Sequence, residues 1–134
     1  MLRVTEFLDI KKISGLRQAA LGRGLDGQDS LSWHAALFDG DALCGAGRLY
    51  RRGEDIVIDS LALTSARREY REILFRTILL KAVNLAPERI FAPEETPEYL
   101  SDFGFKERKG AFFASPAEVV FPSLCGGKGC GGSG

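Results

Sequence analysis

Three arginines in a short segment are the residues best suited to bind an anion. Arg67, Arg68 and Arg71 lie in the segment 66–73, at the start of a predicted helix. A guanidinium group donates paired hydrogen bonds to a phosphate or a carboxylate. The same spacing also fits a solvated helix face with ion pairs such as Arg68–Glu72. The segment therefore predicts either an anion site or an ordinary charged surface.

Two cysteines near the C-terminus are a second candidate for chemistry. Cys125 and Cys130 lie in the glycine-rich stretch CGGKGCGGSG. A closed zinc site needs four ligands, so two thiolates could hold a metal only with help from a second tail. A disulfide within the tail, covalent attachment, and a flexible tail with incidental cysteines are the alternatives. Cys44 lies in an apolar run and is expected to be a small buried residue.

Composition limits the class of protein. The chain has 134 residues, with 18 basic and 18 acidic side chains and a net charge of zero. This balance argues against a nucleic-acid binder, which normally carries a basic excess. No apolar stretch is long enough to span a bilayer, and the first residues lack the apolar core of a signal peptide. We therefore expect no membrane partner and a cytoplasmic protein, with one domain over residues 1–123 and a flexible tail over 124–134.

The spacing of apolar residues predicts an alternation of strands and helices. An antiparallel meander precedes the longest helix, and a crossover to a parallel strand follows it, which predicts an α+β or mixed α/β domain of three layers. A cap at Thr64 or Ser65 is expected to begin that helix. The predicted strands are 2–8, 31–38, 42–51, 56–63, 88–92, 105–114 and 117–121, and the other predicted helices are 9–21 and 97–102.

Three segments within residues 2–121 follow one another in an order that is typical of a known family. They are 35–49, 58–63 and 99–105, and the last contains the Gly104-Phe105 pair, whose distance from the long helix is the most specific feature. On these residues the chain resembles the GNAT superfamily of N-acetyltransferases, in which they match the second and third strands, the fourth strand and the signature before the sixth strand. The resemblance implies a central, mostly antiparallel twisted sheet with flanking helices.

The resemblance implies that acetyl-CoA is the acyl donor. Members of the family bind the pyrophosphate of acetyl-CoA at the glycine-rich start of the long helix, where backbone N–H groups and the helix dipole favour an anion. The segment 66–73 has no glycine, so guanidinium groups would have to replace those donors. The end of the fourth strand would hold the pantetheine through its backbone. The implied cofactor-binding residues are Leu61, Ala62, Leu63, Arg67, Arg68, Tyr70 and Arg71.

The resemblance also implies catalytic residues for transfer of the acyl group to an amine. Asp59, on the predicted fourth strand, is the best-placed general base. The family's tyrosine that protonates the leaving thiolate falls on Leu100, so Tyr99, one residue earlier, is the nearest candidate acid.

Two functions remain open. The first is an acetyl-CoA-dependent N-acyltransferase that acts on an unknown amine. The second is a catalytically degenerate GNAT fold that works as a binding or interaction module, with a thiol- or metal-active tail as a further option. The short first helical region also leaves a homodimer open.

Overall fold

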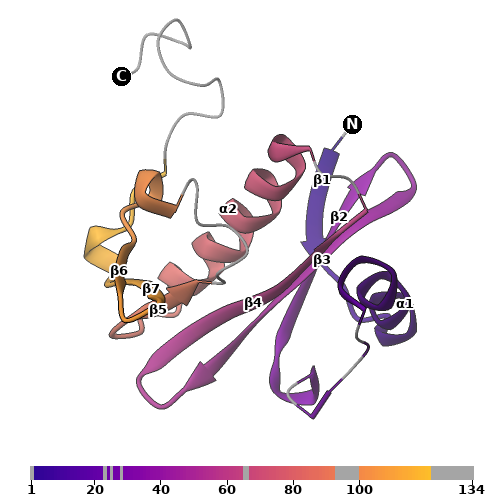
Figure 1. Ribbon diagram of the computed structural model, residues 1–134. Helices are drawn as coiled ribbons and strands as arrows, with labels where there is room; N and C mark the ends of the chain where they lie inside the picture. Colours follow the sequence, from indigo (N-terminus) through magenta and orange to yellow (C-terminus); the bar gives the residue numbers. More distant parts are fainter. Residues whose placement is uncertain are drawn as a thin grey trace, which may run out of the picture.

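A computed structural model describes residues 2–22, 24, 26–27, 29–64, 67–92 and 100–121, except for the side chains of Ser60 and Arg68. The described strands form one sheet in the order β1-β2-β3-β4-β5-β7-β6 (Figure 1). The strands are β1 (Leu2–Glu6), β2 (Trp33–Asp39), β3 (Ala42–Arg52), β4 (Asp55–Leu63), β5 (Ile90–Ala92), β6 (Lys106–Arg108) and β7 (Ala111–Ala114). The helices are α1 (Ile10–Leu21) and α2 (Arg68–Asn84), and 3₁₀ turns span Asp29–Leu31, Ser101–Phe103 and Pro116–Glu118.

The topology confirms the predicted fold class. Strands β1 to β4 form an antiparallel meander, and α2 then leads to β5, which pairs with β4 in parallel. Strands β5, β7 and β6 continue the sheet with antiparallel pairing. In Figure 1 the two helices lie on opposite sides of the meander, which gives the expected three layers.

The two helices begin in different ways. Helix α1, predicted over 9–21, begins at Ile10, and Asp9 is its N-cap, because the Asp9 side chain accepts a hydrogen bond from the Lys12 amide at 3.2 Å. The predicted cap of α2 at Thr64 is wrong. Arg67 occupies the N-cap position without a side-chain cap, and the Thr64 hydroxyl instead donates to the Cys44 carbonyl oxygen at 3.2 Å. The alternative cap, Ser65, lies outside the described residues.

The C-terminal region departs from two predictions. The strand predicted over 105–114 is a hairpin, because Lys109 and Gly110 adopt φ values of 53° and 81° and turn the chain between β6 and β7. The strand predicted over 117–121 is wrong: Pro116–Glu118 is a 3₁₀ turn closed by a capping box of Ser115 and Glu118. Most of the short helix predicted over 97–102 lies outside the described residues; Ser101–Phe103 form a 3₁₀ turn that ends at Gly104, as expected.

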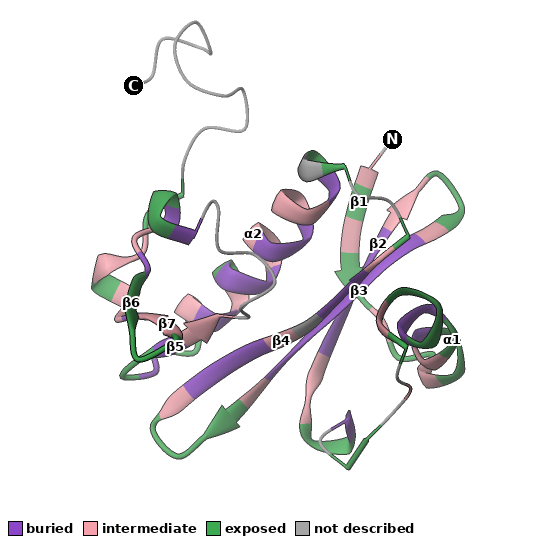
Figure 2. Cartoon of the chain, in the orientation of Figure 1, coloured by how far each residue is buried: buried purple, intermediate pink, exposed green. Residues whose placement is uncertain are grey.

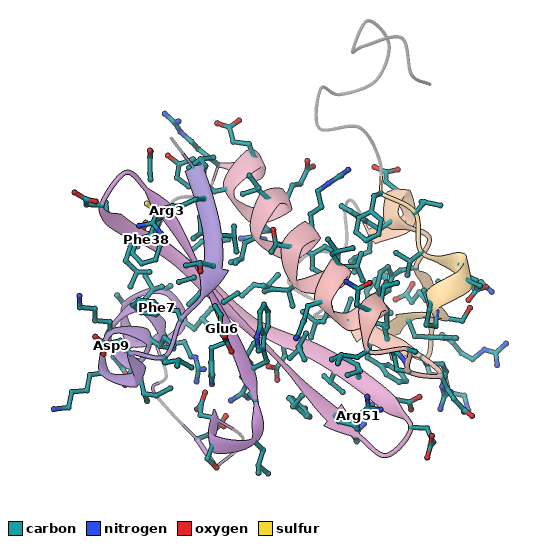
Figure 3. All side chains as sticks on the ribbon, turned by 180° about the vertical axis from the view of Figure 1, so that it is seen from behind. Arg3, Glu6, Phe7, Asp9, Phe38 and Arg51 are labelled. Carbon is teal, nitrogen blue, oxygen red and sulfur yellow. The ribbon has the colours of Figure 1, made fainter. Side chains whose placement is uncertain are left out.

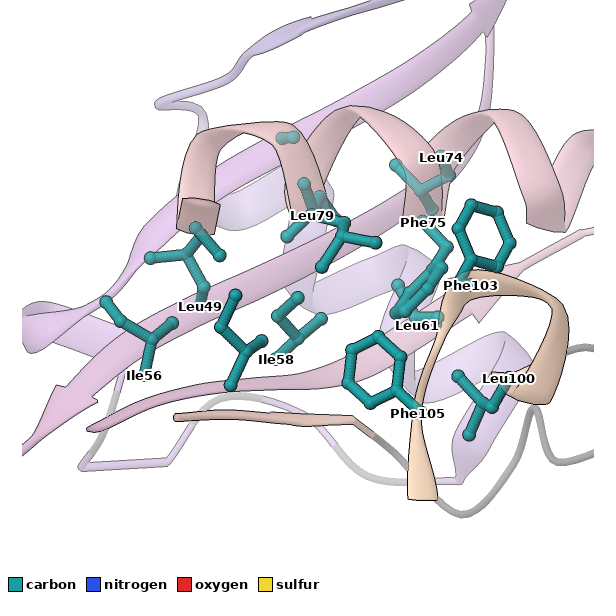
Figure 4. Packing of buried hydrophobic residues seen from close by; sticks show 14 of the residues in the cluster. Leu49, Ile56, Ile58, Leu61, Leu74, Phe75, Leu79, Leu100, Phe103 and Phe105 are labelled. Carbon is teal, nitrogen blue, oxygen red and sulfur yellow. The ribbon is translucent and has the colours of Figure 1, made fainter. Parts of the chain in front are cut away.

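The larger core lies between α2 and the sheet. Leu74, Phe75 and Leu79 of α2 are fully buried against strand residues such as Ile58 (Figure 4). Glycine at position 47 of β3 makes this approach possible, because a Cβ atom there would lie 2.5 Å from Ile78 Cδ1. The helix therefore sits close to the middle of the sheet.

The face that carries α1 is different in composition. Ile13 and Leu16 of α1 pack on Ala46 and Ala62 in a small apolar cluster. Buried residues run along β3 and β4 between the two helices (Figure 2). Among the described residues, four polar or charged side chains are also buried: Arg17, Asp29, His34 and Arg48. This face thus combines a modest apolar core with buried charge.

Side chains at the β1 edge and at the start of β2 complete the packing. The Arg3 guanidinium lies 4.5 Å from the centre of the Phe38 ring, which also meets Phe7 edge-on at 5.4 Å (Figure 3). Trp33, the only tryptophan, has Lys81 Nζ of α2 at 5.5 Å from its ring centre. Among the described residues, no helix is both long and apolar enough to cross a membrane.

Candidate functional site

Strand β4 is paired unequally on its two sides. It pairs with β3 from Asp55 to Leu63, but its last described pair with β5 is Val57↔Phe91. A bulge interrupts the β3 side: from Arg48↔Asp59 to Ala46↔Ala62, β3 advances by two residues and β4 by three. Beyond Val57, β4 therefore runs on with one described neighbouring strand and one extra residue.

The bulge reverses the side-chain alternation of β4. Ile56 and Ile58 lie in the core under α2, and after the bulge Leu61 does so as well. Ala62 packs on the α1 face instead. Without the extra residue, Leu61 would have pointed toward α1, since strand side chains alternate.

The bulge also determines which way the backbone N–H and C=O groups point in the last residues of β4. The Thr64 amide donates to the Cys44 carbonyl oxygen of β3 at 2.9 Å. Backbone groups alternate along a strand, so Ala62 also faces β3, while Leu61 and Leu63 present their N–H and C=O groups to the opposite side. On that side, Val57↔Phe91 is the last described pair of β4 with β5. Two of the three predicted pantetheine-binding residues therefore present backbone groups there.

The start of α2 follows directly in the chain. The Arg67 carbonyl accepts hydrogen bonds from the amides of Tyr70 and Arg71, at 3.2 and 3.4 Å. The first turn of a helix directs N–H groups outward and carries the positive end of the helix dipole. Arg67 and Glu69 form an ion pair at 3.7 Å with both side chains exposed. The Arg68 side chain lies outside the described part of the chain.

Tyr70 anchors this helix start to the β2–β3 turn. Its hydroxyl donates to Asp39 Oδ2 at 2.8 Å, and its ring belongs to the core under α2. This hydrogen bond is the main cause that lowers the pKa of the Asp39 carboxyl and raises the pKa of the Tyr70 hydroxyl. Tyr70 is one of the residues that the resemblance implied for cofactor binding. Its side chain is held inward, so a cofactor contact by Tyr70 would come from its backbone.

Asp59, the predicted base, lies at the bulge and faces α1. Both of its carboxylate oxygens accept hydrogen bonds from Arg48, from Nε at 2.6 Å and from Nη2 at 3.3 Å. The Asp59 side chain is 29% exposed, whereas that of Arg48 is 6% exposed. The sequence did not predict this partner. Its role as a base stays a prediction, but its position is fixed by Arg48.

Arg48 is the centre of a larger ion cluster. Its Nη1 and Nη2 also donate to the two carboxylate oxygens of Asp26, at 2.7 and 3.1 Å. Nη1 lies 3.1 Å from Asp29 Oδ1. Burial alone would lower the pKa of Arg48, but hydrogen bonds to Asp26 and Asp59 outweigh it and raise that pKa. The guanidinium is therefore firmly charged.

Asp29 is held from three elements. Arg17 of α1 donates to both of its carboxylate oxygens, one of them at 2.9 Å, and the Asp26 amide donates to Oδ2 at 2.6 Å. His34 Nε2 lies 3.0 Å from its backbone oxygen. Burial alone would raise the pKa of Asp29, but the Arg17 hydrogen bond and the other donors hold it well below its usual range. We call these residues, Arg17, Asp26, Asp29, His34, Arg48 and Asp59, the ion cluster.

Other predicted site residues are less informative. Leu100, which stands where the family has its acidic tyrosine, is fully buried in the core. Tyr99, Cys125 and Cys130 lie outside the described residues. Within the described part of the chain, no three His, Cys, Asp or Glu side chains are arranged to hold a metal ion. Cys44 is buried, as expected.

Solved structures with the same fold are acetyltransferases. A GNAT family acetyltransferase from Elizabethkingia anophelis with acetyl-CoA bound matches with a TM-score of 0.67 and 12% identity, over 84% of this chain and 95% of that one. A Bacillus subtilis acetyltransferase in complex with CoA matches with a TM-score of 0.64 and 16% identity, over 86% and 99% of the two chains.

N-acetylglutamate synthase from Neisseria gonorrhoeae, complexed with coenzyme A and N-acetyl-glutamate, matches with a TM-score of 0.65 and 22% identity. The match covers 81% of this chain, which spans only 29% of the length of the synthase. No protein-family model matches the sequence, and no curated protein matches it either. The comparisons establish that the chain has the GNAT fold.

Proposed function

We propose that this GNAT-fold chain is an acetyl-CoA-dependent N-acyltransferase that acts on an amine. The observation that carries the proposal is the order of features along β4 and α2. The bulge of β4, beyond its last described pair with β5, is followed within a few residues by a helix start with Arg67, Arg68 and Arg71. The structural neighbours with CoA or acetyl-CoA bound support the same ligand.

The acyl donor would bind along this edge. The backbone groups of Leu61 and Leu63 face the side of β4 that lies opposite β3. They would hydrogen-bond the pantetheine amides there, with Ala62 between them. The pyrophosphate would lie at the start of α2, where the helix dipole and the guanidinium groups of Arg67, Arg68 and Arg71 favour an anion. The guanidinium groups would replace the backbone donors of the missing glycines.

The reaction would be direct transfer in a ternary complex. The amine nitrogen attacks the thioester carbonyl carbon, the C–S bond breaks, and CoA leaves as a thiolate. Asp59 accepts the proton that the amine loses, directly or through water. Tyr99 or a water molecule protonates the thiolate. Arg48 fixes the orientation of the Asp59 carboxylate through two hydrogen bonds.

Calorimetric titration with acetyl-CoA and with CoA, under reducing conditions, tests the proposal. Micromolar binding that collapses in Arg68→Ala/Arg71→Ala is the expected result. Arg108→Ala is the matched control, because it removes an exposed arginine of β6 and should leave the affinity unchanged. A wild-type chain that does not bind at millimolar ligand would rule out the enzyme.

The second candidate is a binding module that has lost the chemistry. The observation that favours it is the buried Leu100 at the position of the family's acidic tyrosine. Under this alternative, CoA or another anion still binds at the α2 start, but no amine is acetylated. A function of the tail would be a separate matter: removal of residues 125–134 should then abolish metal content or activity while the melting temperature stays unchanged.

A further inference from the structure

The described residues of the connection between α1 and β2 are attached to the rest of the fold through charged side chains. In the 3₁₀ turn of this connection, Leu31 is 74% exposed, whereas Asp29 is 7% exposed. This is the reverse of the usual distribution, in which leucine is buried and aspartate is exposed. Among the described residues of the connection, Asp26 and Asp29 accept contacts from Arg17 and Arg48.

Arg48 is the residue that joins this connection to β4. It lies on β3, in register with His34 of β2 on one side and with Asp59 of β4 on the other. Its guanidinium donates four hydrogen bonds to the carboxylates of Asp26 and Asp59, and Nη1 also lies 3.1 Å from Asp29 Oδ1. Because the guanidinium is directed at three carboxylates of the chain itself, we do not assign Arg48 as a receptor for a substrate anion. Arg48 instead holds the carboxylates of Asp26, Asp29 and Asp59 together, and we call this arrangement the clamp.

The clamp holds together groups that would otherwise repel one another. Asp26, Asp29 and Asp59 carry three negative charges around one guanidinium, and Arg17 offsets only a part of this charge through Asp29. If the Arg48 charge is removed, the three carboxylates are left with the single positive charge of Arg17, and leaving buried charges unpaired is costly. The exposed Asp26 would be the first to move away, because it can be solvated without unfolding the sheet.

The position of Asp59 links this clamp to the site. Asp59 faces α1 at the bulge of β4, beyond the last described pair of β4 with β5. If Asp59 accepts the proton of the amine, the amine must approach on the α1 face, beside the connection that carries Asp26. The acyl donor, in contrast, would bind along Leu61–Leu63 of β4 and at the α2 start, and neither segment contains a residue of the ion cluster.

We propose that Arg48 is a positioning residue for the acceptor half of the site. It orients Asp59 and docks the α1–β2 connection beside it, so it governs amine binding without affecting the binding of acetyl-CoA. The part of this inference that concerns the amine rests on the proposed function. The part that concerns the docked connection between α1 and β2 does not depend on the proposed function.

Variants of Arg48 test the inference. Arg48→Met keeps the length of the side chain without the charge, and Arg48→Lys keeps the charge as a single donor centre. Arg52→Met on the exposed end of β3 is the matched control. NMR hydrogen exchange is read at the amides of Asp29 and Ser32, which donate hydrogen bonds to the carbonyls of Asp26 and Asp29. Kinetics with the amine and calorimetry with acetyl-CoA complete the measurement.

In Arg48→Met, we expect exchange at these two amides to become at least about tenfold faster and the KM for the amine to rise by a similar factor. The dissociation constant for acetyl-CoA should stay within about twofold of that of the wild type. Arg48→Lys should give an intermediate result, and Arg52→Met none. If Arg48→Met does not fold, Asp26→Asn should show the same pattern more weakly, because it weakens one side of the clamp.

Three results would overturn the inference. Unchanged exchange in a folded Arg48→Met chain would show that the connection is held by something else. A parallel loss of acetyl-CoA binding would show that Arg48 supports the whole fold rather than one half of the site. If the wild-type chain does not bind acetyl-CoA, the proposed function and the statement about the amine both fail, while the exchange rates still decide whether Arg48 docks the connection.

Discussion

The two faces of the sheet are stabilised by different kinds of interaction. The α2 face has an extended apolar core, in which side chains such as Phe75, Ile78 and Leu79 are fully buried. The α1 face has four buried residues in its apolar cluster and sets the ion cluster beside them. Apolar burial is strong and non-directional, whereas guanidinium–carboxylate bonds fix orientation at a cost in desolvation. The α2 face is therefore the scaffold, and the α1 face is where positions are specified.

The largest effect is expected from a cavity in the α2 core. Phe75 is fully buried and meets the Phe103 ring edge-on at 5.3 Å. Phe75→Ala should lower the free energy of unfolding by about 3–5 kcal/mol, measured by denaturant titration. Leu80→Ala on the same helix is the control, because Leu80 is 50% exposed and should change little. Equal losses for the two variants would contradict the described orientation of α2.

The ion cluster should come second. Asp29→Asn removes the charge that Arg17 and Arg48 share, and we expect a loss of about 3 kcal/mol in the free energy of unfolding. Because the pKa of Asp29 is lowered on folding, its contribution is present above the ordinary carboxyl pKa of about 4 and is lost as the pH falls further. The acid limb of stability should therefore be shallower in the variant than in the wild type. Glu69→Gln, in the exposed pair with Arg67, is the control and should leave the free energy of unfolding and its dependence on pH unchanged. Equal effects of Asp29→Asn and Glu69→Gln would argue against burial as the cause.

The Tyr70 anchor should have a smaller effect, because its ring stays in place when only the hydroxyl is removed. Tyr70→Phe should lower the Tm by a few degrees at neutral pH. The raised pKa of Tyr70 means that this stabilisation is present below about pH 10 and is lost as the pH rises through the pKa of the folded protein. The Tm of the wild type should thus converge on that of the variant in alkali. A gap that persists unchanged there would point to packing rather than to the hydrogen bond with Asp39.

The smallest effect concerns the edge of the α1 face. Arg3 is exposed and lies over the Phe38 ring at 4.5 Å. Arg3→Met should cost about 0.5 kcal/mol in thermal or denaturant unfolding. Arg3→Lys should retain part of the interaction, since the charge stays over the ring. A loss as large as that of Asp29→Asn would mean that the edge, not the ion cluster, stabilises this face.

The sequence predicted most of the fold because local patterns agree with it. Asp9 and Gly22 bound α1 as their residue types indicate, and the Asp-Gly turn joins β2 to β3. The errors lie where a short local device overrides an apolar run. The dipeptide Lys109-Gly110 was the missed signal for the β6–β7 hairpin, and the capping box at Ser115 was the missed signal for the last 3₁₀ turn.

The candidate site could be predicted only in part. The backbone groups of β4 and the helix start come from elements that the spacing already indicated. The ion cluster could not be predicted, because its charges lie far apart in the chain and Asp26 and Asp29 look like ordinary turn residues. Arg48 was the available clue, since it is a charged residue inside an otherwise apolar returning strand. Its meeting with Asp59 depends on the register between β3 and β4, which only the folded sheet sets.

The position of the single tryptophan gives this chain an intrinsic optical probe. Trp33 is the residue before His34 of the ion cluster, and its ring packs with the core under α2 beside Lys81. One fluorophore thus reports on the border between the two faces. Its emission responds to the environment of the ring, and the polarity of that environment changes when α2 separates from the sheet. Quenching by iodide or acrylamide follows the opening of this border in the unmodified protein.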